Sequence, residues 1–138
     1  MLAAKRRLQS GIEQVTRDQS DQAVRERCRT LYGFVEEAWP VLEPETPFVG
    51  GWAVRAICDH LEAVSAGRIR HLLINIPPGF AKSLIVSVFW PAWEWGPNGT
   101  PSMRILAASY EEGLAIRDNT RMRRWRLASL SCESGPGD

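Results

Sequence analysis

The stretch that most constrains the fold of this 138-residue chain is LLINIPPGFAKSLIVSVFW, residues 72–90. It begins with an apolar run interrupted only by Asn75, which is typical of a central parallel strand covered on both faces. A Pro/Gly turn follows and ends in Lys82 and Ser83, and the apolar residues after it predict a helix from Ser83 to about Trp93. A buried strand, a tight turn with Lys-Ser and a helix together form an arrangement that can hold phosphate groups.

The turn differs at two positions from the usual phosphate-loop pattern, G-x-x-x-x-G-K-[ST]. Ile76 and Ala81 stand where that pattern has glycines. A phosphate loop binds its ligand through converging backbone N–H groups, which require a tight turn and space rather than a particular side chain. We therefore expect Ala81 to be tolerated, provided that its φ angle is negative.

The candidate donors begin at Gly79, because Pro77 and Pro78 have no N–H group. In this interpretation the binding residues are Gly79, Phe80, Ala81, Lys82 and Ser83. Lys82 would contact the β- and γ-phosphates, and Ser83 would be a ligand of Mg²⁺ through the bound nucleotide. The alternative is an ordinary strand, turn and helix in which Lys82 is solvated and Ser83 caps the helix.

Helices are expected before this stretch. Residues 1–29 are polar with a thin apolar face, which favours a solvated helix or a partly ordered arm. From Thr30 to Trp39 apolar residues recur with helical spacing; Thr30 can cap the start and Pro40 can stop the end. After a Pro/Gly linker a second apolar stripe predicts another helix, which ends at Gly67.

A second strand and a basic helix complete the predicted order. The apolar run 104–109 is expected to lie parallel to 72–76, with a right-handed crossover through the helix between them. The tail 127–138 is small and polar and is expected to fray. These elements predict an α/β fold: a partial P-loop NTPase core of three αβα layers with parallel strands over residues 30–126, preceded by N-terminal helices.

Composition narrows the function only slightly. The net charge of +1 gives no whole-chain argument for nucleic acid binding. The three cysteines, Cys28, Cys58 and Cys132, are widely spaced and form no disulfide or zinc pattern. No apolar run approaches the roughly 20 residues of a membrane span, and the N-terminus lacks the pattern of a signal peptide. We therefore expect a cytoplasmic protein with no membrane partner.

Three stretches stand in a characteristic order along the chain: FVEEAWPVLEPETPFVGGW, AICDHLEAVSAGRIRHLLINIPPGFAKSLIVSVFWPAWEWG and ASYEEGLAIRDNTRMRR. Together they resemble the N-terminal ATPase region of the large terminase subunits of tailed bacteriophages and prophages, from about residue 31 to 124. Loops of the form P-P-x-x-x-K-S are usual in that family, so Ala81 counts little against the resemblance. The resemblance implies a DNA-packaging motor that uses ATP and Mg²⁺, and that forms a homo-oligomer on the portal. Its other partners would be double-stranded DNA, the portal protein and the small terminase subunit.

The resemblance also suggests roles for residues outside the loop. Trp52 is similar to the upstream aromatic residue that such ATPases place near the adenine; the alternative is a core tryptophan at a helix start. Arg117, Arg121 and Arg124 share a helical face and could meet DNA phosphates or the ATP of a neighbouring subunit. The alternative for them is a solvated face. The pair Ser109-Tyr110 is similar to an SY pair that follows the second strand in the family.

Two parts of the family pattern are missing. No apolar strand ends in an acidic pair, because Glu36-Glu37 and Glu111-Glu112 are better explained as solvated helical positions. The resemblance also implies a C-terminal nuclease domain that cuts the DNA concatemer in the full-length proteins, and we expect this chain to lack it. We therefore expect a terminase fragment whose enzymatic activity is open. The alternatives are a prophage remnant without ATPase activity, and another P-loop ATPase such as a kinase or a helicase-like protein.

Overall fold

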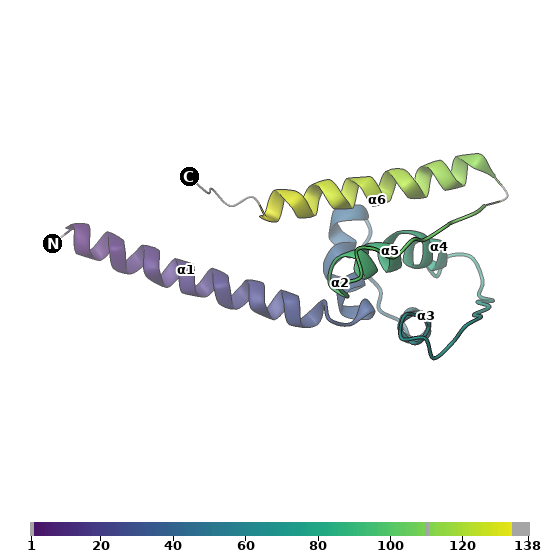
Figure 1. The fold of residues 1–138 in the computed structure, drawn as a ribbon. Coiled ribbons are helices and arrows are strands. Elements are labelled where there is room, and N and C mark those ends of the chain that lie inside the picture. Colours follow the sequence, from purple (N-terminus) through teal and green to yellow (C-terminus); the bar gives the residue numbers. More distant parts are fainter. Residues whose placement is uncertain (1, 110, 134–138) are drawn as a thin grey trace.

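The computed structural model describes residues 2–109 and 111–133, and these form helices joined by irregular segments (Figure 1). The long helices are α1 (Leu2–Arg27), α2 (Leu31–Leu42), α3 (Trp52–Ser65) and α6 (Glu112–Glu133). Between α3 and α6 a continuous helical stretch comprises α4 (Lys82–Leu84), the π-helical segment η1 (Ile85–Phe89) and α5 (Trp90–Trp95). Helix α6 packs on α2 and η1, whereas α1 extends away from the other helices (Figure 1).

The prediction of two parallel strands is wrong. Residues 72–76 and 104–109 have irregular backbone, and the described part of the chain contains no strand or sheet, so the three-layer αβα core is not formed. In the first segment Leu73 is 92% exposed, while alternate residues pack against the helical core. Leu106 of the second segment is 95% exposed. A parallel pair is stable when both faces are covered, and these exposures show that no described helix covers the outer face of either segment.

The predictions for α2 and α3 are mostly confirmed. The main-chain N–H of Gly33 donates to the Thr30 hydroxyl at 3.1 Å, so Thr30 caps α2 as expected. Helix α2 continues beyond Trp39 to Leu42, and Pro40 lies inside its last turn rather than ending it. The predicted apolar stripe of α3 is buried at Val54, Ile57, Cys58 and Leu61.

The π-helical segment has a local cause. Pro91 lacks an N–H group, and its ring crowds the carbonyl four residues earlier in a normal α-helical turn. The main-chain N–H of Trp90, the residue before it, donates to the carbonyl of Ile85, five residues back. The wider turn ends directly before Pro91 and lets the helix continue through the proline.

Both ends of the chain are helical as far as they are described. The side chains of residues 13–23 in α1 are all exposed, as its thin apolar face predicts. Helix α6 continues to Glu133, into the segment for which fraying was expected, and residues 134–138 of that tail lie outside the described residues. Within the described ranges, no helix combines the length and the apolar character needed to cross a bilayer.

Hydrogen bonds across the sequence fix the helices to one another. The main-chain N–H of Leu31, at the start of α2, donates to the Glu62 carboxylate of α3 at 2.7 Å. The indole N–H of Trp93 in α5 donates to the carbonyl of Cys28 at 3.0 Å, at the end of α1. Each bond joins residues that are more than 30 positions apart, so the packing of α2, α3 and α5 is specified by polar contacts as well as by apolar burial.

Glu94 is the one buried charged residue among the described side chains. Its carboxylate accepts hydrogen bonds from Ser65, from Asn98 at 2.9 Å, from Thr100 at 2.7 Å and from the Trp90 indole at 3.2 Å. Burial alone would raise the pKa of Glu94, but the hydrogen bonds from Ser65, Thr100, Asn98 and Trp90 lower the pKa below its usual value. The ionised form is therefore the one that joins α3, α5 and the loop after α5.

We predict that Glu94→Gln destabilises the fold by about 2 kcal/mol at pH 7, because an amide nitrogen would then face hydrogen-bond donors. The folded-state pKa of Glu94 is lower than its unfolded value of about 4.3. Its stabilising effect is therefore complete above that value and is lost as the pH falls through the folded pKa. Urea unfolding of both proteins from pH 7 to pH 3 measures this, with the exposed Glu45→Gln as the control. A difference between Glu94→Gln and the parent chain that stays constant down to pH 3 would contradict the assignment.

Candidate phosphate-binding pocket

The Pro-Pro-Gly-Phe-Ala-Lys-Ser loop forms one wall of an open pocket of about 530 Å³. This volume is within the range of roughly 300–1,000 Å³ that is usual for small-molecule sites. The lining residues come from the loop and the helix start (Ile76, Pro77, Pro78, Gly79, Phe80, Ala81, Lys82, Ser83, Leu84), from the end of α2 (Trp39, Glu43) and from α6 (Arg117, Arg121). All five residues predicted to bind phosphate therefore face one space.

The loop has two residues with positive φ angles. Gly79 has φ +97°, and Ala81 has φ +53° and ψ 17°, which is the left-handed helical region. The condition under which Ala81 was expected to be tolerated, a negative φ angle, is not met. A left-handed alanine is strained because its Cβ approaches the following carbonyl oxygen. The backbone at this position therefore has the conformation for which the usual loop pattern has glycine, although the residue is alanine.

The backbone donors of the loop are available to a ligand. Helix α4 begins at Lys82, directly after the left-handed residue, and the N–H of Ile85 donates to the Ala81 carbonyl at 2.9 Å. Among the described residues, no hydrogen bond uses the main-chain N–H of Gly79, Phe80 or Ala81 as donor. The first N–H groups of a helix also lack an intrahelical acceptor. A left-handed residue followed by helical residues forms a concave set of N–H groups that suits an anion.

Three cationic side chains line the pocket: Lys82 at the helix start, and Arg117 and Arg121 on α6. The two arginines are four residues apart and therefore lie on the same face of α6. The sequence left their role open between DNA, a neighbouring subunit and solvent, and the structure brings both to the loop of their own chain. Arg124 is exposed and does not line the pocket, so the three arginines are not grouped at one site.

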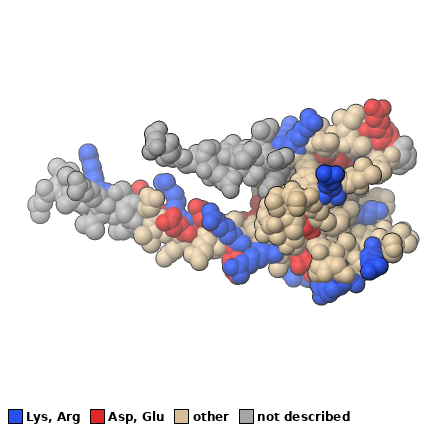
Figure 2. Space-filling view, in the orientation of Figure 1, with Lys and Arg blue, Asp and Glu red and all other residues tan. Residues whose placement is uncertain are grey.

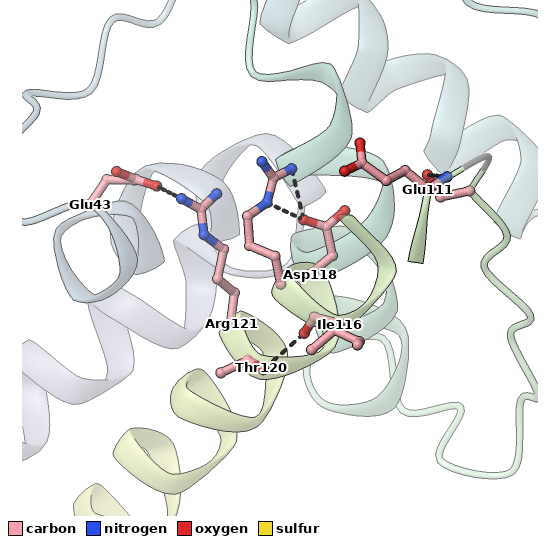
Figure 3. Close-up of polar contacts among 8 residues, drawn as sticks. Glu43, Glu111, Ile116, Asp118, Thr120 and Arg121 are labelled. Atoms are coloured by element: carbon pink, nitrogen blue, oxygen red, sulfur yellow. Dashed lines mark hydrogen bonds and ion pairs between the residues drawn. The ribbon is translucent and has the colours of Figure 1, made fainter. Parts of the chain in front are cut away.

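Both pocket arginines have acidic partners. Arg121 forms an ion pair with Glu43, with Nη2 and Oε1 3.0 Å apart, and Figure 3 shows Arg121 extending from α6 toward that carboxylate. Arg117 pairs with its sequence neighbour Asp118 at 3.2 Å. Among the described residues that line the pocket, Glu43 supplies the one carboxylate.

Sequence analysis missed Trp39 and Glu43. Trp39 belongs to the apolar stripe of α2, and nothing in the stripe distinguishes a residue that also borders a pocket. Glu43 follows α2 without any motif. Trp52 does not line the pocket and is 83% exposed at the start of α3, whereas Phe80 is an exposed aromatic residue that does line it. Of the pair Ser109-Tyr110, Tyr110 lies outside the described residues.

The pocket offers few ligands for a metal ion. The described residues contain no group of three or more His, Cys, Asp or Glu side chains that could hold one. Ser83 supplies a hydroxyl and Glu43 a carboxylate, but Glu43 is paired with Arg121. The donor set therefore fits Mg²⁺ only as the complex of a nucleotide, in which phosphate oxygens and water provide most of the ligands.

The charge distribution outside the pocket is mixed. Figure 2 shows Lys and Arg side chains interspersed with Asp and Glu over this face of the molecule. A double-stranded DNA interface usually gathers basic residues in a patch or stripe. The pocket brings three cationic residues together: Lys82, Arg117 and Arg121.

Comparison with known proteins adds no identification: no family model, curated protein or solved structure matches this chain.

We predict that Ala81→Gly stabilises the fold by roughly 0.5–1 kcal/mol. Relief of the left-handed strain contributes about 1–2 kcal/mol, and the greater freedom of glycine in the unfolded chain offsets about 0.5–1 kcal/mol of it. Ala115→Gly, at an exposed position within α6, should instead destabilise by about 1 kcal/mol. Urea unfolding measures both free energies, and equal losses in the two variants would show that Ala81 is not left-handed in solution.

Proposed function

We propose that this chain binds ATP, as its Mg²⁺ complex, through the phosphates in the loop pocket. We further propose that it is the ATP-binding N-terminal part of a terminase large subunit. One observation carries the first proposal. The loop with its left-handed Ala81, the side chain of Lys82 and two arginines from a distant helix all line one pocket.

The charges of the pocket favour a polyphosphate. Among the described lining residues, three positive charges outnumber one negative charge: those of Lys82, Arg117 and Arg121 against that of Glu43. Each phosphate group carries further negative charge, so a triphosphate gains more from several cations than a monophosphate does. The backbone N–H groups from Gly79 onward add neutral donors that do not depend on side-chain type.

The phosphates, rather than the base, are expected to supply most of the binding free energy. Trp52, the residue expected near the adenine, does not line the pocket. Phe80 is 41% exposed and borders it, so its ring is the available aromatic surface for a base. We therefore expect other nucleoside triphosphates, and inorganic tripolyphosphate, to compete with ATP at this site.

The terminase assignment rests on the sequence resemblance alone. In that family the full-length protein couples ATP hydrolysis to the packaging of double-stranded DNA, with a portal protein and a small subunit as partners. The competing assignment is a remnant that binds no nucleotide. ATP binding that depends on Lys82 separates the two assignments, because a remnant that binds no nucleotide would not show it.

We predict that Lys82→Ala weakens MgATP binding at least tenfold. Hydrogen bonds to charged groups contribute about 1.5–3 kcal/mol, which corresponds to roughly ten- to 150-fold in affinity. Isothermal titration calorimetry measures the dissociation constants, and Arg104→Gln, an exposed position outside the pocket, is the control. ATP binding that is unchanged in Lys82→Ala would place the site elsewhere, and the absence of binding in the parent chain would favour the remnant.

We also predict binding without turnover. Phosphoryl transfer requires a residue that positions the attacking water and an acidic group linked to Mg²⁺. Glu43 supplies the one carboxylate among the described residues that line the pocket, so the pocket has no second acidic group and cannot fill both roles. A phosphate-release assay, with and without double-stranded DNA, should show no turnover that depends on Lys82. A rate near 1 s⁻¹, roughly the lower end for working enzymes, would show that a carboxylate is positioned for catalysis after all.

A further inference from the structure

Glu43 is an unexpected residue in a pocket for anions. It directly follows the last residue of α2, and its main-chain N–H donates to the Trp39 carbonyl at 2.9 Å, so the end of the helix fixes its backbone. Its carboxylate borders the same space as Lys82 and the two arginines. A carboxylate in this place repels a phosphate ligand unless it is neutralised by a cation.

Arg121 neutralises the carboxylate of Glu43. The ion pair joins the end of α2 to the middle of α6, with Nη2 and Oε1 3.0 Å apart (Figure 3). The side chains are 34% exposed for Arg121 and 26% exposed for Glu43, so both are partly sheltered and still accessible from the pocket. The guanidinium fork of an arginine matches the geometry of a phosphate as well as that of a carboxylate, so Arg121 can pair with either.

We propose that Glu43 competes with the phosphate ligand for Arg121 and thereby sets the affinity of the pocket. In the empty pocket Arg121 is paired with Glu43; when a triphosphate binds, Arg121 moves from the carboxylate to a phosphate oxygen. This inference rests on the proposed ATP site. Arg121 is then a binding residue whose availability depends on Glu43. Binding replaces the direct link between the end of α2 and α6 by a link, through the ligand, between α6 and the loop.

The ion pair between Arg117 and Asp118 does not link two helices. The two residues are neighbours on α6, so an exchange of partner there changes no contact between helices.

Glu37 offers a matched comparison for Glu43. It lies on α2, also forms an ion pair with an arginine, Arg27, and does not line the pocket. Removing the charge of Glu37 therefore alters the net charge by the same amount but leaves the site intact.

The experiment compares Glu43→Gln, Arg121→Gln, the double variant and Glu37→Gln. Calorimetry measures the affinity of each for MgATP and for inorganic tripolyphosphate, with Lys82→Ala as the blank. Glu43→Gln should bind about three- to tenfold more tightly than the parent, because the pair no longer has to be broken and the repulsion is gone. Arg121→Gln should bind more weakly, and Glu37→Gln should match the parent.

The double variant decides between exchange and simple repulsion. If Arg121 changes partner, the gain from Glu43→Gln is clearly smaller in the Arg121→Gln background, because no pair remains to be broken there and only the repulsion is relieved. An equal gain in both backgrounds would show repulsion only and would overturn the exchange. Weaker or unchanged binding by Glu43→Gln, with binding still dependent on Lys82, would overturn the inference but leave the ATP site in place. If no variant shows binding that depends on Lys82, both proposals fail.

Discussion

The arrangement of the pocket depends on the burial of Phe89 between two aromatic side chains of α2. Phe89 is completely buried; its ring is stacked on Trp39, with centroids 6.0 Å apart, and meets Phe34 edge-on at 6.4 Å. Such pairs add about 0.5–1.5 kcal/mol each beyond the burial of apolar area. Because Trp39 also borders the pocket, the contact that forms the core places the end of α2 opposite the loop from Gly79 to Ser83.

The helices could be predicted from the sequence because their signals are local. The hydroxyl of Thr30 and the apolar spacing after it determine the start and the buried face of α2, and both are short-range properties. The prediction of strands failed because a strand is stable only when another strand pairs with it. Residues 72–76 have the side-chain alternation of a strand and partly bury one face, but Leu73 remains exposed. An apolar run indicates burial, and it does not indicate what will cover it.

For the candidate site, too, the local part could be predicted from the sequence and the contacts between distant segments could not. The loop from Gly79 to Ser83 was found because its residue types follow one another along the chain. The approach of Arg117 and Arg121 to that loop results from the packing of α6 on α2 and η1, which no local pattern encodes. The φ angle of Ala81 could not be read from the sequence for a related reason: an alanine alone favours a negative φ angle, and the turn into α4 imposes a positive one.

The position of Glu43 connects the expected lack of hydrolysis to the control of affinity. A carboxylate that serves as a base in phosphoryl transfer must be free to accept a proton or to orient water. While Arg121 is paired with Glu43, the carboxylate is occupied and the arginine is withheld from the ligand. If a phosphate takes Arg121 as we propose, the carboxylate is released beside an anion, where repulsion disfavours close approach to it. In that proposal the same ion pair limits binding in the empty pocket, and the described lining residues include no second carboxylate to assist hydrolysis, so this arrangement of charges would favour ground-state binding.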